Sequence, residues 1–179
     1  YFIQIFSFCS VEFLNFTFQS GGFFLEIPGN LVLEKPIEIH FIHDDPDVSF
    51  SHPLYFVHAG SGSSITLIER FEKNSGSSVT DQGGLINALG YYHLDQNASI
   101  RHIKWQDLPA AQSLVYKLAI TQDKDSRFNS LAIDFGGDTI RNNVEVELEG
   151  SNTYTSLQAG FLAQARQSMD HQTRINHKV

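Results

Sequence analysis

Cysteine is almost absent from this chain of 179 residues, which contains only Cys9. A single cysteine excludes an internal disulfide and any CxxC metal or redox motif. It also favours a reducing compartment, so we expect a cytoplasmic location. Basic residues are scarce as well, because 12 Lys and Arg stand against 20 Asp and Glu, for a net charge of −8. Without a basic run to neutralise phosphates, we expect no nucleic acid among the partners.

Long hydrophobic runs are also missing. The longest apolar runs fall far short of the roughly 20 residues that a membrane helix needs, so we expect no membrane partner. The apolar amino end lacks the basic region and small-residue cleavage site of a signal peptide. The first residue is Tyr1, and we expect the chain to be a fragment of a longer protein. Its length predicts one domain, residues 1–179, which needs no disulfide or metal to fold.

The motifs of several enzyme classes are absent. The sequence has no GxxxxGK[ST] phosphate loop, no GxSxG elbow and no HExxH metal motif. Gly60-Ser61-Gly62 lacks the third glycine of a dinucleotide fingerprint and lies in a turn pattern. We therefore expect this chain neither to hydrolyse ATP nor to be an enzyme.

A repeated unit of strand, short polar turn and strand is the strongest pattern that is present. In the best example, Val144, Val146 and Leu148 alternate with three glutamates, which is typical of a half-buried strand. The turns that separate such strands are Gly60-Ser61-Gly62, Asp95-Gln96-Asn97, Asp123-Lys124-Asp125 and Gly150-Ser151-Asn152, and the first apolar residues after them are Ile65, Ile100, Phe128 and Tyr154. A unit of roughly 25–35 residues indicates an all-β solenoid with little helix. A sandwich built from similar hairpins is the alternative.

Other segments are less clear. The phenylalanine-rich stretch from Phe2 to Phe18 fits either a strand or a short buried helix. Residues 110–119 have a helical spacing of apolar residues, but we expect mostly strand from Leu114 onward because turn signals resume at once. Residues 73–84 are rich in Ser and Gly, which predicts a loop.

Three groups of polar residues are candidates for a site. A cluster of His and Asp residues could bind a metal, but the odd spacing of its histidines puts them on opposite faces of a strand, and the DxDxDG spacing of a calcium loop is missing. Its members are His40, His43, Asp44, Asp45 and Asp47. For His171 and His177 we favour hydrogen-bond ladders between neighbouring strands over catalysis. For Glu145 and Glu147 we favour a solvated face. We therefore predict no catalytic, cofactor-binding or metal-binding residue.

Several short motifs follow one another along the chain. They are Phe13-Leu14-Asn15, residues 22–28, Leu33-Glu34-Lys35-Pro36-Ile37, Leu67-Ile68-Glu69-Arg70, residues 98–104, Arg141-Asn142-Asn143, Leu148-Glu149-Gly150 and residues 170–177. None is specific alone, but together they extend over nearly the whole chain, and in this order they resemble the SufB/SufD family of scaffold proteins of the SUF iron–sulfur cluster assembly system. The last of these, with Asp170, Thr173 and His177, is more similar to the SufD branch than to the SufB branch.

This resemblance implies a right-handed parallel β-helix, of which the chain covers the first part, without the family's flanking helical regions. It further implies a SufB-like subunit and a SufC-like ATPase as partners. An iron–sulfur cluster would be bound only transiently, at the level of the complex, and no cofactor is expected in this chain. The segment from Thr173 to Val179 carries no cap, so we also expect the isolated chain to self-associate there.

Two rival functions remain open. A β-helical carbohydrate-active enzyme would require an acidic groove with calcium, or a carboxylate pair with a positioned arginine. A plain structural β module would have no partner. An assay for glycan or uronate cleavage separates the first rival from a scaffold, and co-purification of the full-length protein separates the second.

A solenoid of strands predicts a far-ultraviolet circular dichroism spectrum with much less helix than the usual share of about 30 %. The spectrum of the purified chain checks this directly. A spectrum dominated by helix would contradict the solenoid.

The substitution Cys9→Ser should leave folding nearly unchanged, because a lone cysteine among phenylalanines acts as a small hydrophobic residue. The isolated chain should also reconstitute no stable iron–sulfur cluster, since clusters are normally held by several thiolates. Stoichiometric cluster absorbance that disappears in the Ser variant would overturn both expectations.

Overall fold

The structure is a computed structural model that describes residues 10–42, 50–72, 83–164 and 166–178. Nearly all of the regular structure in these ranges is strand. In chain order the elements are α1 (Ser10–Phe18), β1 (Gly21–Ile27), β2 (Ile37–Ile42), β3 (Phe50–Ser51), β4 (Pro53–Ala59), β5 (Ser64–Glu72), β6 (Gly84–Leu94), β7 (Ser99–Leu108), β8 (Gln112–Gln122), β9 (Arg127–Gly136), β10 (Thr139–Leu148), β11 (Tyr154–Leu162) and β12 (Ser168–His177). No helix in the described ranges has both the length and the apolar character needed to cross a bilayer.

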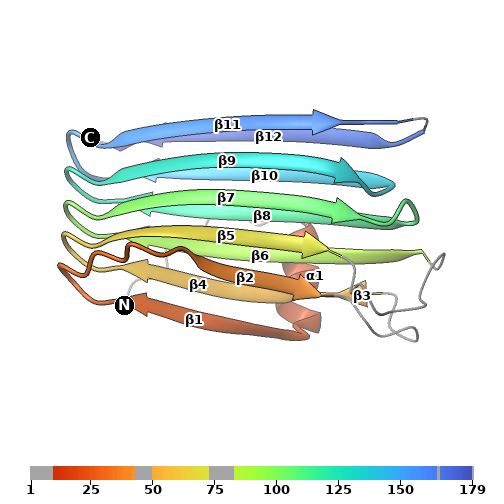
Figure 1. Cartoon of the computed structure of the whole chain (residues 1–179), viewed down its shortest axis with the longest axis horizontal. Coiled ribbons are helices and arrows are strands. Elements are labelled where there is room, and N and C mark those ends of the chain that lie inside the picture. Colours follow the sequence, from red (N-terminus) through yellow and green to blue (C-terminus); the bar gives the residue numbers. More distant parts are fainter. Residues whose placement is uncertain (1–9, 43–49, 73–82, 165, 179) are drawn as a thin grey trace.

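Two parallel sheets face each other along the whole stack (Figure 1). One has the strand order β1-β4-β6-β8-β10-β12, with β3 beside β6, and the other has the order β11-β9-β7-β5-β2. From β4 onward, strands that follow each other along the chain lie in different sheets, and each pairs with the next strand but one. Parallel pairing needs a crossover, which the intervening strand of the other sheet supplies. The prediction of a parallel β-helix is confirmed, whereas the hairpins of the sandwich alternative are absent from the described strands.

The short turns have a common backbone conformation. The residues Asn30, Gly62, Asn97, Asp125 and Asn152 have φ between 59° and 70°. Such values favour Gly, Asn and Asp, which explains the composition of the predicted turns. At four of these positions the backbone N–H donates to a carbonyl of the following turn: Asn30 to Ser61, Gly62 to Gln96, Asn97 to Lys124 and Asp125 to Ser151. The hydrogen-bond ladder thus continues through the turns.

Inward side chains stack on their equivalents in the neighbouring strand. Ile65, Ile100 and Phe128 are register partners, and each is at most 3 % exposed. The sequence pattern placed Tyr154 in the same series, but Thr155 is the partner of Phe128, and Tyr154 is 50 % exposed. A tyrosine next to a polar turn fits either face of a strand. Hydrophobicity alone therefore assigned the inward position to Tyr154, one residue before the residue that occupies it.

Helix α1 packs against β4 and β6 on the outer side of the larger sheet. Its polar residues, not its phenylalanines, face the sheet. Glu12 forms an ion pair with Lys117, and the side chain of Asn15 donates to the carbonyls of Pro53 and Asn87. Phe13 is 59 % exposed, so of the two interpretations of this stretch the helix is right for residues 10–18, but its aromatic face is not buried.

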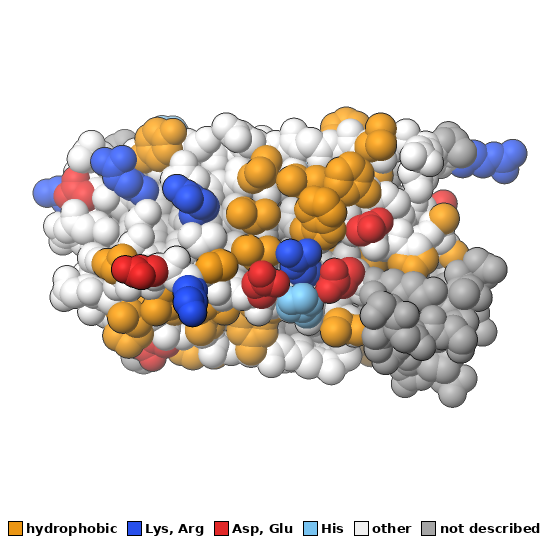
Figure 2. Space-filling view, in the orientation of Figure 1, with side chains coloured by type: hydrophobic (Ala, Val, Ile, Leu, Met, Phe, Trp, Pro, Cys, Tyr) orange, Lys and Arg blue, Asp and Glu red, His pale blue; other side chains and the backbone are white. Residues whose placement is uncertain are grey.

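The outer face of the smaller sheet has an apolar centre (Figure 2). Ile68, Ile103 and Leu131 are register partners there, and the rings of Trp105 and Phe135 lie 5.3 Å apart.

The expectation of strand from Leu114 onward is confirmed, since β8 extends from Gln112 to Gln122. Most of the predicted loop, residues 73–82, lies outside the described part of the chain.

The positive φ of Asn97 predicts the effect of replacing it. Asn97→Val should destabilise the fold by about 1–2 kcal/mol relative to Asn97→Gly, because the left-handed conformation forces Cβ against the backbone. Urea denaturation of the two variants gives this difference. The side chain of Asn97 is exposed, so lost packing does not complicate the comparison. Equal midpoints would show that the turn is not held in this conformation.

Candidate functional site

The interior of the β-helix contains a polar network at its centre. The inward positions of β5, β7 and β9 begin with apolar residues after each turn and then become polar. As a result Glu69, His102, Lys104 and Asp134 are each at most 2 % exposed. Charged groups removed from water in this way need partners, because burial without partners costs several kcal/mol.

Glu69 is the acceptor at the centre of one half of the network. The hydroxyl of Tyr92 donates to Oε1 at 2.5 Å, and the hydroxyl of Tyr116 donates to Oε2 at 2.9 Å. Nε2 of His102 lies 3.5 Å from Oε2. Burial alone would raise the pKa of Glu69, but His102 and the tyrosine hydroxyls outweigh it and hold the pKa below its ordinary value. Burial, together with the charge of Glu69, raises the pKa values of both tyrosines, so they stay neutral donors.

Asp134 is the centre of the other half. Its Oδ1 accepts a hydrogen bond from Nζ of Lys104, and its Oδ2 accepts one from Nδ2 of Asn142 at 3.0 Å and lies 3.1 Å from Nε2 of His171. The ammonium of Lys104 also lies 5.1 Å from the centre of the Tyr116 ring, a cation–π distance. Burial lowers the pKa of Lys104 even though Asp134 opposes the shift, and burial likewise lowers the pKa of His171.

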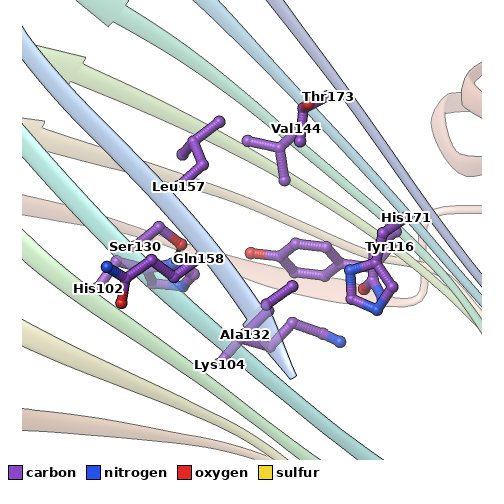
Figure 3. Close-up of a pocket in the computed structure, with 12 residues that line it drawn as sticks. His102, Lys104, Tyr116, Ser130, Ala132, Val144, Leu157, Gln158, His171 and Thr173 are labelled. Atoms are coloured by element: carbon purple, nitrogen blue, oxygen red, sulfur yellow. Dashed lines mark hydrogen bonds between the residues drawn. The ribbon is translucent and has the colours of Figure 1, made fainter. Parts of the chain in front are cut away.

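A cavity of about 70 Å³ lies beside this network, between β7, β9 and β11 on one side and β8, β10 and β12 on the other (Figure 3). The residues in its wall include the polar His102, Ser130, Asn142 and His171 and the apolar Val144 and Leu157. Oδ1 of Asn142 is buried without a hydrogen-bond partner, and Nε2 of His102 has only its 3.5 Å contact with Glu69. A cavity with these dimensions and free polar atoms can bind water or a small polar molecule.

The network also contains the residue types of a proton relay. Nδ1 of His102 lies 2.9 Å from Oγ of Ser130, and its other nitrogen faces Glu69. This order resembles a nucleophile, a base and an acid. Ser130, His102 and Glu69 are each at most 9 % exposed. Both carboxylate oxygens of Glu69 already accept hydrogen bonds from tyrosine hydroxyls. The arrangement can therefore move a proton or hold water, but it offers no access to a large substrate.

The two histidines that were predicted to form hydrogen-bond ladders, His171 and His177, lie in different surroundings. His171 lies in the network, where Nδ2 of Asn142 and Nε2 of His171 are 3.2 Å apart across neighbouring strands, which confirms a ladder at this position. His177 lies on the same side of β12 as His171 but is exposed.

His40, from the predicted cluster of His and Asp residues, lies on the outer surface, where its two nitrogens face Glu72 at 2.8 Å and Glu38 at 3.2 Å.

The prediction that Glu145 and Glu147 form a solvated face is wrong. Both point outward, but Lys117 forms an ion pair with Glu145, and Lys178 with Glu147. The side chain of Glu145 is 14 % exposed and that of Glu147 only 8 %. Burial would raise the pKa of Glu147, but Lys178 and Asn176 outweigh it and lower the pKa. The alternating pattern correctly predicts that the two glutamates point outward. It cannot show the lysines that pair with them, because Lys117 lies on β8 and Lys178 follows β12.

Some candidates lie outside the described part of the chain. These are Cys9, His43, Asp44, Asp45 and Asp47. The expectation that they hold no metal or cluster therefore stays a prediction.

The residues of the network were missed as a group by the sequence analysis. One signal was available, since Glu69 lies between Leu67 and Phe71 at an inward position of an alternating strand. A charged residue at such a position indicates a buried partner. Its partners could not be identified, because they lie 23 to 47 residues away in the chain and only the register brings them together.

Comparisons with known proteins agree on one family. The family model described as SUF system FeS cluster assembly, SufBD core domain, matches residues 41–179. The chain is 26 % identical over 167 residues to the iron–sulfur cluster assembly protein SufD of Bacillus subtilis, covering 92 % of this chain and 37 % of the relative. It is 27 % identical over 158 residues to an iron–sulfur cluster assembly SufBD family protein of Synechocystis sp., covering 84 % of this chain and 35 % of the relative. The chain thus spans about a third of the length of these relatives. No solved structure matches it significantly.

Breaking the pair of Lys104 and Asp134 should be costly. Lys104→Met leaves Asp134 buried without its cation and should lower the free energy of unfolding by about 3–5 kcal/mol. The double variant Lys104→Met/Asp134→Asn removes the charge as well and should recover much of this loss. Urea denaturation measures both. A double variant as unstable as the sum of the two single variants would show that the groups do not interact.

Proposed function

The chain belongs to the family of SUF system FeS cluster assembly proteins defined by the SufBD core domain, and on this premise we propose that it is a non-catalytic scaffold subunit in iron–sulfur cluster assembly. The observation that carries the proposal is the family match over residues 41–179, a range that takes in every strand from β3 to β12. The parallel β-helix supports it, because a rigid stack presents extended surfaces to other subunits.

The composition supports a role without catalysis. One cysteine cannot hold a cluster that normally needs several thiolates, so the remaining ligands would come from outside this chain. This chain also has no phosphate loop, so we place ATP hydrolysis outside it. A cluster would then contact this protein only transiently, at the level of the complex.

We assign it two partners, a SufB-like subunit and a SufC-like ATPase, and a place in the cytoplasm. The net charge of −8 agrees with protein partners better than with nucleic acid.

The buried network supports the scaffold role in another way. Its partners lie on different strands of both sheets, so pairing all of them favours a single register and a well-defined surface.

The test is purification of the tagged full-length protein from its own cells, followed by identification and quantification of the proteins that accompany it. The expected result is a SufB-like subunit and a SufC-like ATPase in fixed ratio. ATP hydrolysis should be measurable for the complex and absent for the full-length protein alone. An unrelated tagged protein from the same cells is the control for adventitious capture.

Two results would contradict the proposal. One is a full-length protein that purifies without either partner under conditions in which those partners are present and assembled with other subunits. The other is ATP hydrolysis or glycan cleavage by the full-length protein on its own, because either activity would make it an enzyme.

A further inference from the structure

Two histidines stack on the outer face of the larger sheet, whereas the network lies in the interior. His58 and His93 are register partners on β4 and β6, with ring centres 5.6 Å apart. Their neighbours Val57, Ala59, Tyr92 and Leu94 are buried, so alternation points the two histidines outward. Their side chains are 32 % and 44 % exposed, so both rings are partly open to solvent.

A carboxylate lies between the two imidazoles. Asp95 begins the turn after β6, and its backbone N–H donates to the carbonyl of Ala59, which holds it above both histidines. Its Oδ1 lies 3.2 Å from Nε2 of His58 and 3.2 Å from Nε2 of His93. One ligand atom from each of the three residues falls within 4.8 Å of the others.

Two more carboxylates surround this cluster. Oδ2 of Asp123 lies 3.8 Å from Nε2 of His93, and Oε1 of Glu26 lies 3.9 Å from Nδ1 of His58. Among the described residues, no Lys or Arg forms an ion pair with Glu26, Asp95 or Asp123. Three carboxylates therefore surround two histidines, and none of the three is paired with a Lys or Arg in the part of the chain that the structure describes.

We propose that His58, His93 and Asp95 form a surface site for a divalent first-row transition metal ion such as Zn²⁺, with Asp123 in reach as a fourth ligand. Imidazole nitrogen and carboxylate oxygen are ligands that such ions accept. Bonds of about 2.0–2.1 Å in a tetrahedral site put neighbouring ligand atoms about 3.3 Å apart, close to the two separations of 3.2 Å.

The position of Glu26 agrees with this assignment. It faces the ring nitrogen of His58 that does not point at Asp95. A carboxylate behind a ligating imidazole fixes its tautomer and raises its basicity. Hydrogen bonds from the two histidines to one carboxylate would explain the position of Asp95 but not those of Asp123 and Glu26. A bound cation accounts for the positions of all three carboxylates.

The experiment titrates the untagged chain with Zn²⁺ alone by equilibrium dialysis and with Co²⁺ to record the visible absorption of a tetrahedral site. The test variants are His93→Gln and Asp95→Asn. The matched control is His40→Gln, because His40 is 41 % exposed and also flanked by two carboxylates, but each of its nitrogens faces a different one. Circular dichroism establishes that every variant is folded, and His58→Gln replaces any variant that is not.

The chain should bind one Zn²⁺ that the control retains. His93→Gln and Asp95→Asn should each weaken it at least about tenfold, since even loss of a group behind a ligand costs about 10–100-fold. Zn²⁺ should also raise the melting temperature of the chain and of the control, but not of the two variants. The absence of saturable binding, or equal affinity in the test variants and the control, would overturn the proposal. Neither result bears on the scaffold role.

Discussion

Parallel pairing in strict register is the constraint on which the rest of the structure depends. From β4 onward, each strand lies beside the strand two elements further along the chain, and the turns extend the same ladder through backbone hydrogen bonds. A residue is therefore stacked on a fixed equivalent above and below it. Apolar columns such as Ile65, Ile100 and Phe128 arise in this way, and burying them stabilises the fold. The same rule aligns His58 with His93 on the outside.

The interior charges follow from this constraint and also reinforce it. Glu69 and Asp134 are fully buried, so each must be paired where it stands. Their partners come from both sheets and from strands 8 to 47 residues apart in the sequence. A slip of one residue would turn every inward side chain of a strand outward and separate these groups. A slip of two residues would keep the faces, and an apolar lumen would tolerate it more easily, since its inward residues resemble one another. The network therefore contributes specificity as well as stability.

Sequence alone predicts the fold well and the site poorly, for a physical reason. Alternation at Val144, Val146 and Leu148 and the Asn, Asp and Gly residues of the turns are local signals, so the strands and turns could be read directly. Register is not local, which is why Tyr154 was placed one residue out and the partners of Glu145 were missed. The pairing of Glu69 with Tyr116, and of His58 with His93, depends on the same register and could be found only in the folded chain. Helix α1 was ambiguous because it turns polar residues toward the sheet.

The most direct test of the parallel register is a set of interstrand nuclear Overhauser contacts for the backbone of β7 in the isotopically labelled chain. The account predicts contacts of Ile100 with its register partners Ile65 and Phe128, and the same pattern repeated two residues on for His102 with Leu67 and Ser130. Contacts that instead pair β7 with β6 in the antiparallel order of a hairpin, joining Ile100 to His93, would contradict it. In that case neither the interior network nor the paired histidines could exist as described.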